Sequence, residues 1–395
     1  MRYLEVFWIF LKLGCTSFGG PIAHLMYFRE AFVEHRKWLS ETEYLNIVTL
    51  CQTLPGPASS QVGFSIGLMR AGLLGALLAF IAFTLPSILV LITFANYLYL
   101  FDSDLGQAAL QGLAILALAV VLHGVIGMGK QLCKQTRHFT IAVLTFVALL
   151  LAPSPAMQVV VIVLGAAAAY FFRGNSRHQN IDAKTSDFTL KLKTSAKWSV
   201  GLAPFFALSF IVLLFSLAYI WPLADDFYRS GALVFGGGHV VMPLLESALV
   251  SVDKLSEAEF LAGYGATQAV PGPMFSFAAY LGYLMPGNDG GIIGALTASI
   301  FIFLPGFLLV LAVLPYWQRI SQHTQAQGAI AGASAAVVGL LAAALYDPIF
   351  THAILHAHDL AVAAIAYAAL ARWKIPVLFV VVFCVLAKVL LAFFY

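Results

Sequence analysis

The sequence predicts an all-α polytopic membrane protein made of two inverted-topology repeats that contain broken, re-entrant helical hairpins. Three observations support this fold class. The 395-residue chain is 61% hydrophobic and only 10% charged. Its apolar segments are interrupted at Pro55-Gly56-Pro57 and again at Pro271-Gly272-Pro273. Matched motifs recur at a nearly constant offset, and the loops beside them differ in charge.

The composition excludes a soluble protein. A soluble chain carries about a quarter charged residues, whereas this chain has a mean hydropathy of +0.92. The net charge of +3 is small, and the basic residues lie in loops that flank apolar segments. We therefore expect a lipid bilayer as the surroundings and no nucleic acid as a partner. The four cysteines lie far apart without metal-ligand or redox spacing, so we expect no metal and no cofactor.

Several motif pairs indicate an internal duplication. The Gln-x-x-Pro-Gly-Pro unit that begins at Gln52 recurs at Gln268, an offset of 216 residues, and Gly72 recurs as Gly291 at an offset of 219. The other pairs are Phe18-Gly19-Gly20-Pro21 with Phe235-Gly236-Gly237-Gly238, Leu39-Ser40-Glu41 with Leu255-Ser256-Glu257, Leu85-Pro86 with Leu304-Pro305, and Gln111-Gly112 with Gln327-Gly328. Ordered matches at nearly one offset identify a tandem duplication with small gaps.

Loop charge predicts that the two repeats are inverted. Basic loops of membrane proteins stay in the cytoplasm, which places 29–37, 130–138 and 173–197 inside. The acidic loop 250–259 belongs outside, although it is the repeat partner of the basic loop 29–37. Matched loops on opposite sides are the pattern of inverted repeats in secondary transporters.

Four segments are expected to turn back inside the membrane. A span needs about 20 residues, whereas the break at Pro55-Gly56-Pro57 leaves arms of about 13 residues each. The expected hairpins are 3–34 with its turn at Gly19-Gly20-Pro21, 41–69 with its turn at Pro55-Gly56-Pro57, 227–250 with its turn at Gly236-Gly237-Gly238, and 257–285 with its turn at Pro271-Gly272-Pro273. The expected full spans are 72–100, 105–129, 138–152, 155–172, 198–221, 290–316, 325–345, 353–371 and 375–394.

The domain organisation follows from these elements. Residues 1–172 form the first transporter repeat, and residues 198–395 form the second, which has an extra leading helix. Between them, 173–197 is the one long polar stretch of the sequence, and its basic composition predicts a solvated cytoplasmic linker.

The breaks are the candidate binding site. A proline directly after a glycine favours the first position of a helix, so the second arm of each hairpin starts within the membrane. A helix start binds oxyanions through its free amides. The substrate-binding candidates are Gly19, Gly20, Pro21, His24, Gln52, Pro55, Gly56, Pro57, Ser59, Ser60, Gln61, Gly236, Gly237, Gly238, His239, Gln268, Pro271, Gly272, Pro273 and Ser276. The first arm ends nearby with the opposite dipole sign, so the net field stays open, and the prolines could serve only to kink the chain.

Histidines carry the remaining chemistry. His24 and His239 are intramembrane ionisable residues, which are either functional groups or neutral rings bonded to backbone carbonyls. His352, His356 and His358 have metal-ligand spacing, since residues i and i+4 share one face of a helix. This cluster supports one rival function, a membrane metalloenzyme.

The motifs together resemble the chromate transporter (chromate ion transporter) family in its long-chain, two-domain form. The resemblance rests on Phe18-Gly19-Gly20-Pro21-x-x-His24, Trp38-Leu39, Gln52-x-Leu54-Pro55-Gly56-Pro57-x-Ser59-Ser60-Gln61, Phe235-Gly236-Gly237-Gly238 with Pro243-Leu244, and Pro271-Gly272-Pro273. It covers nearly the whole chain.

The resemblance implies a multi-pass carrier of the bacterial inner (plasma) membrane that exports chromate with the proton motive force, and no enzyme activity. Sulfate or another oxyanion is the alternative substrate, because sulfate is similar in shape to chromate. Proton coupling against anion exchange, uptake against efflux, and association into a homodimer stay open. His24 and His239 are the candidate groups for proton coupling because they titrate near physiological pH.

Overall fold

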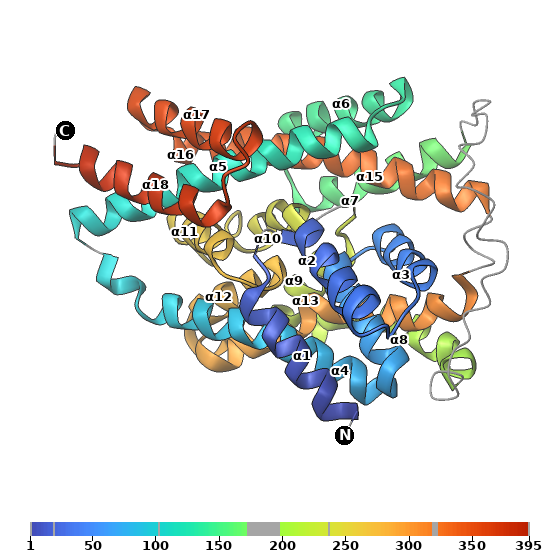
Figure 1. Ribbon diagram of the computed structural model, residues 1–395. Helices are drawn as coiled ribbons and strands as arrows, with labels where there is room; N and C mark the ends of the chain where they lie inside the picture. Colours follow the sequence, from blue (N-terminus) through green and yellow to red (C-terminus); the bar gives the residue numbers. More distant parts are fainter. Residues whose placement is uncertain are drawn as a thin grey trace.

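The computed structural model describes residues 2–18, 20–101, 103–171, 198–235, 238–317 and 323–393, and the regular elements in these ranges are helical (Figure 1). The predicted linker 173–197 lies outside the described residues. The first repeat holds α1 (Arg2–Thr16), α2 (Gly20–Arg29), η1 (Glu30–His35), α3 (Glu41–Thr53), α4 (Ala58–Asn96), α5 (Asp104–Leu132), α6 (Thr136–Leu151) and α7 (Pro155–Phe171).

The second repeat follows the same order after one extra helix. It holds α8 (Trp198–Ile220), α9 (Pro222–Ala232), η5 (Gly238–Val240), α10 (Val241–Leu249), α11 (Glu257–Ala269), η6 (Met274–Ser276), α12 (Phe277–Leu284), α13 (Gly291–Val313), α15 (Thr324–Ala344), α16 (Thr351–Ala353), α17 (Ala357–Ala371) and α18 (Val377–Leu391). The predicted all-α fold of two repeats with broken hairpins is confirmed.

Five helical segments of the described chain are long and apolar enough to cross a membrane. They are Ala58–Asn96, Asp104–Leu132, Gly201–Ile220, Gly291–Tyr316 and Gln325–Ala353. The helices α6, α7, α17 and α18 are apolar but shorter. The protein is therefore a multi-pass membrane protein.

The re-entrant arms begin in the same way in both repeats. The side chain of Ser40 accepts a hydrogen bond from the amide of Glu43, and Glu43 reaches back to the amide of Ser40. Ser256 and Glu259 form the same capping box at the start of α11. A capping box satisfies two amides that would otherwise lack acceptors. The duplicated Leu-Ser-Glu motif therefore fixes where α3 and α11 start.

Each arm is followed by a backbone position with a positive φ angle, a conformation that glycine adopts more readily than other residues. Gly56 has φ of +118° and Gly272 has φ of +107°. The chain becomes helical again at Ala58 and at Met274, so Pro57 and Pro273 precede the new helices. We expected prolines at the first helical position, and the structure places these two one residue earlier, as the capping residues.

A second break separates each re-entrant arm from the following long helix. Within α4, Ala71 and Gly72 leave the helical conformation, and Gly72 has φ of +68°. The equivalent Gly291 has φ of +65° and begins α13 after α12 has ended. The predicted boundary between the hairpin 41–69 and the span 72–100 is therefore confirmed.

The C-terminal helices of each repeat pack against the long helix of the other repeat. The long helix α5 packs against α17 and α18, and its counterpart α15 packs against α6 and α7 (Figure 1). Glycines permit the close approach: a Cβ added at Gly112 would lie 2.8 Å from the carbonyl oxygen of Cys384, and one at Gly328 would lie 3.1 Å from that of Ala169. This reciprocal packing is that of repeats related by a two-fold rotation, and the opposite loop charges place the axis in the membrane plane.

We predict that Gly56→Ala and Gly272→Ala each destabilise the protein. A Cβ at Gly56 would lie 2.9 Å from Gln61 Nε2, one at Gly272 would lie 2.9 Å from Ser87 Oγ, and both residues have positive φ. The left-handed conformation alone costs a non-glycine residue about 1–2 kcal/mol. Thermal unfolding in detergent should show a lower Tm for both variants.

The matched control is Gly127→Ala on α5, where an added Cβ meets nothing within 4 Å. Alanine in a helix interior is more stable than glycine by about 0.5–1 kcal/mol, so this variant should unfold at the same or a higher temperature. Equal Tm values for all three variants would show that the breaks tolerate a side chain.

Candidate functional site

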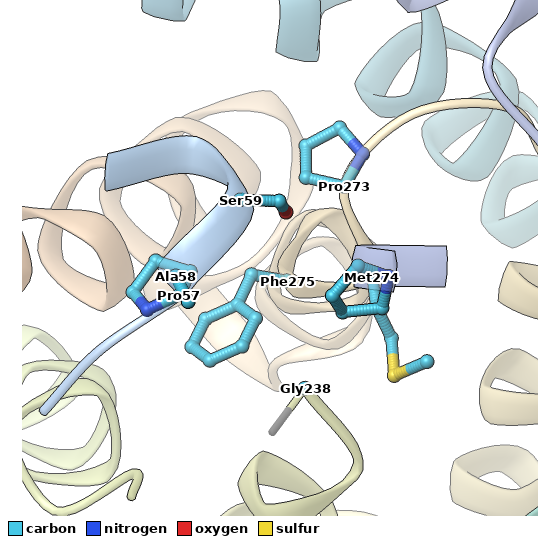
Figure 2. Close-up of a pocket in the computed structure, with 8 residues that line it drawn as sticks. Pro57, Ala58, Ser59, Gly238, Pro273, Met274 and Phe275 are labelled. Carbon is cyan, nitrogen blue, oxygen red and sulfur yellow. The ribbon is translucent and has the colours of Figure 1, made fainter. Parts of the chain in front are cut away.

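Four helix starts meet around one cavity at the interface of the two repeats. The cavity is small, with about 20 Å³ of space open to the centre of a water molecule. Figure 2 shows its lining, which consists of Pro21, Pro57, Ala58, Ser59, Gly238, Pro273, Met274 and Phe275. These residues belong to the starts of α2, α4, η5 and η6. We call this set of helix starts, with the breaks that precede them, the central junction.

Two hydrogen bonds between the repeats hold the central junction together. The amide of Gly56 donates to the carbonyl oxygen of Val234 at 2.8 Å, and the amide of Gly272 donates to that of Ser17 at 3.0 Å. Ser17 and Val234 are repeat partners, because each precedes the Phe-Gly-Gly motif. Each Pro-Gly-Pro turn is therefore bonded to the glycine-rich break of the other repeat.

The helix starts favour a positive potential at the cavity wall. The first amides of a helix lack intrahelical acceptors, and a helix start carries about half a positive charge. Ala58 and Ser59 open α4, and Met274 and Phe275 open η6. The C-terminal ends of α3 and α11 are not part of the lining. Helix starts thus face the cavity, which favours a positive potential there, and none of the described lining residues carries a charge.

Ser59 supplies the polar side chain among the described lining residues of the cavity. Ser59 lies 3.4 Å from Nδ1 of His24, which is fully buried behind it. Nε2 of the same ring lies 3.2 Å from the carbonyl oxygen of Ser17. In the second repeat the partner of Ser59 is Phe275. The first repeat therefore supplies the hydroxyl and the imidazole.

Gln61 and Ser276 lie behind the cavity wall. Gln61 Nε2 donates to the carbonyl oxygens of Pro55 at 2.9 Å and of Gly306 at 3.1 Å. The hydroxyls of Ser276 and Ser87 share a hydrogen bond of 2.6 Å. Each contact braces one re-entrant arm against the long helix of the other repeat. Both side chains shape the central junction, and neither is among the lining residues.

Several polar atoms on the segments that pack at the central junction are buried without a hydrogen-bond partner among the described residues. They are Ser17 Oγ, Ser60 Oγ, Gln61 Oε1, Thr84 Oγ1 and Gln268 Nε2. Buried polar groups are normally paired, by protein or by ordered water. These groups can therefore bond to an ordered water or to a polar ligand near the breaks.

The remaining candidates are placed as follows. Gly20 begins α2 with φ of +77°. Gln52 is exposed, and Pro55 and Pro271 are partly buried outside the lining. His239 Nδ1 lies 2.8 Å from the hydroxyl of Tyr264, so its ring points toward α11 and not into the cavity. Gly19, Gly236 and Gly237 lie outside the described residues.

The histidine cluster of the second repeat separates in the structure. His352 forms an ion pair with Glu257, away from the other two rings. His356, His358 and Asp359 stay together, but Lys388 Nζ lies 2.5 Å from Asp359 Oδ1 and 3.5 Å from His358 Nε2. The ammonium group lies beside two of the three candidate ligands and supplies the counter-charge of the buried carboxylate. This geometry disfavours the metalloenzyme alternative.

Comparison with known proteins assigns the chain to a family. The profile of the chromate transporter family matches residues 4–171 and 221–389. The chain belongs to the chromate transporter family. The two matched regions cover α1 to α7 and α9 to α18 and leave out α8. The family resemblance seen in the sequence motifs is thereby confirmed.

Relatives in the chromate transporter family are similar over most of their length. The chain is 28% identical to a probable chromate transport protein of Synechococcus elongatus, covering 85% of this chain and 82% of the relative. It is 25% identical to a chromate transport protein of Pseudomonas aeruginosa, covering 88% and 81%. It is 27% identical to an uncharacterized transporter of Methanocaldococcus jannaschii, covering 86% and 83%. No solved structure matches the chain.

We predict that the double variant His352→Ala/His356→Ala keeps normal transport. Both histidines lie at exposed positions, and neither lines the cavity. Initial rates of chromate transport, normalised to the amount of protein in the membrane, should match those of the unchanged protein. A loss of transport at normal expression, together with metal that copurifies only with the unchanged protein, would support the metal site.

Lys388→Met serves as the contrasting variant in the same experiment. It leaves the carboxylate of Asp359 buried without its ammonium partner, and breaking such a pair costs about 3–5 kcal/mol. This variant should unfold at a clearly lower temperature than the double histidine variant, which loses only the Glu257 contact of His352 and the cap that His356 provides to α17.

Proposed function

We propose that the protein is a secondary active transporter of a tetrahedral oxyanion, with chromate as the leading substrate, and that the cavity of the central junction is the binding site. The observation that carries this proposal is the convergence of four helix starts on one cavity whose described lining has no charged side chain. Membership of the chromate transporter family and relatives named chromate transport proteins support chromate in particular.

The chemistry of the cavity suits an anion with several oxygens. Amides at helix starts and the hydroxyl of Ser59 are donors, and each hydrogen bond to a charged group contributes about 1.5–3 kcal/mol. The helix starts come from different elements of both repeats, and a tetrahedral anion presents oxygens in four directions. Sulfate has the same shape and charge as chromate, so sulfate is the second candidate and an expected competitor.

The architecture suits alternating access. In secondary transporters with inverted repeats, a site at the repeat interface is exposed to one side and then to the other as one repeat rocks against its partner. The hydrogen bonds of Gly56 to Val234 and of Gly272 to Ser17 cross this interface. Motion of the repeats would change these bonds and therefore the shape of the cavity.

We propose export as the direction, in the inner membrane of a bacterium, with the proton motive force as the energy source. The family resemblance supports this assignment. Export of an anion is also favoured by an inside-negative membrane potential, by about 2.3 kcal/mol per charge for each 100 mV. A dianion thus gains about twice this amount on leaving the cell.

The deciding experiment is chromate flux into everted membrane vesicles with an imposed proton motive force. We expect saturable accumulation that depends on the imposed gradient and falls when sulfate is added. Flux that never saturates would indicate a channel. The absence of flux for both chromate and sulfate, with folded protein in the vesicles, would overturn the proposal.

We predict that Ser59→Ala weakens chromate binding about tenfold. Ser59 lines the cavity, and loss of one hydrogen bond to a charged oxygen is worth about 1.4 kcal/mol or more. Equilibrium binding to the purified protein measures the effect. The matched control is Ser65→Ala on the same helix, because Ser65 Oγ donates to the carbonyl oxygen of Gln61 at 2.7 Å and does not line the cavity. If both variants lose affinity equally, the loss reflects packing of α4 and not a contact with the anion.

A further inference from the structure

His24 lies between the cavity wall and a backbone carbonyl. Its Nε2 lies 3.2 Å from the carbonyl oxygen of Ser17, and its Nδ1 lies 3.4 Å from the hydroxyl oxygen of Ser59. The ring is fully buried, while Ser59 lines the cavity directly in front of it. His24 can therefore affect a bound ligand only through Ser59 or through charge.

The carbonyl oxygen of Ser17 fixes the direction of these hydrogen bonds. A carbonyl oxygen can only accept, so Nε2 of His24 must carry a proton. A neutral imidazole has one N–H, which leaves Nδ1 as an acceptor. The hydroxyl of Ser59 then donates to Nδ1, and its proton points away from the cavity. With neutral His24, Ser59 does not offer its proton to an anion.

Protonation of His24 reverses the second bond. Both ring nitrogens of an imidazolium are donors, so Nδ1 donates to the oxygen of Ser59 and the hydroxyl proton becomes free. The 3.4 Å separation is at the long end for a hydrogen bond, which leaves room for the hydroxyl to turn. Ser59 can then donate into the cavity, and a positive charge stands directly behind it.

The described surroundings of His24 offer no charge to stabilise an imidazolium. The first break contributes the carbonyl oxygen of Ser17, and α4 contributes the hydroxyl of Ser59 and the ring of Phe83, whose centroid lies 5.3 Å from that of His24. The other break contributes the amide of Gly272, which shares the carbonyl oxygen of Ser17. None of these groups titrates near neutral pH or carries a charge. An anion in the cavity is therefore the counter-charge that favours protonation.

The geometry points to a proton-coupled relay in which His24 takes up one proton as an oxyanion binds, and Ser59 turns its hydroxyl proton from His24 to the anion. This inference rests on the proposed oxyanion site. The second repeat has Val241 and Phe275 at the equivalent positions, so the relay exists once and couples one proton to each anion. A dianion that moves with this proton carries one net negative charge, so the electrical component of the proton motive force drives its export, while the accompanying proton moves against the pH component.

Linkage gives the relay two measurable consequences. A proton that binds with the anion must strengthen anion binding, and the anion must strengthen proton binding by the same factor. Over the range in which one whole proton is taken up, affinity rises roughly tenfold for each unit that the pH falls. Chromate also titrates in solution, but its own titration is common to the unchanged protein and its variants.

The test is calorimetry of chromate binding to the purified full-length protein between about pH 5 and pH 8, the window in which histidine titrates. Buffers with different ionisation enthalpies report the protons taken up. The variant is His24→Gln, whose amide can donate to Ser17 but cannot be protonated. We expect the unchanged protein to take up about one proton more per chromate than His24→Gln does, and its affinity to rise more steeply as the pH falls.

The control is His123→Gln on α5, where the ring packs against that of Tyr367 outside the cavity. This variant should keep the proton uptake of the unchanged protein. Equal uptake in the unchanged protein and in His24→Gln would overturn the relay and leave the oxyanion site intact. Absence of chromate binding at every pH in the unchanged, folded protein would instead overturn the proposed function.

Ser59→Ala keeps the test decisive if His24→Gln fails to fold. The relay predicts that the loss of affinity from Ser59→Ala is about tenfold at the acidic end of the range and shrinks toward the alkaline end, where the hydroxyl is turned to His24. A loss that stays constant across the range would overturn the relay.

Discussion

A broken backbone inside a membrane must find hydrogen-bond partners within the protein, and this constraint organises the whole molecule. The Pro-Gly-Pro turns free amides and carbonyls at a depth where the bilayer offers no water. The amides of Gly56 and Gly272 are satisfied by Val234 and Ser17, the residues that precede the breaks of the opposite repeat. Because neither turn is bonded by its own repeat in this way, the two halves must interlock, and interlocking brings four helix starts to one cavity.

The breaks, arms and repeats were predictable because proline, glycine and capping residues act locally. Which side chains line the cavity was not predictable from the sequence. Ser59 lines it while Gln61 faces Pro55 and Gly306, since residues two apart on a helix point about 200° apart at 3.6 residues per turn. Sequence alone does not give the rotation of α4 about its axis. The contact of His24 with Ser59 depends in addition on tertiary packing of two separate segments.

Duplication gave the backbone its symmetry, and the side chains have since diverged. Gly56 and Gly272 keep nearly the same backbone conformation. In contrast, Ser59 of the first repeat is replaced by Phe275 at the equivalent position of the second repeat. The brace behind each turn differs as well, with an amide reaching Gly306 on one side and a pair of serines on the other. A single off-centre site with a polar side chain from one repeat can therefore form on a pseudo-symmetric scaffold.

The packing of C-terminal helices against the opposite repeat also constrains how the chain is made. During synthesis α5 emerges and inserts long before α17 and α18, the helices that finally cover it. Until then its glycine-lined face, including Gly112, has lipid or an insertion factor as its neighbour. Neither repeat can reach its final packing alone, so a polypeptide with one repeat of this architecture needs a second copy or a paralogue to complete it.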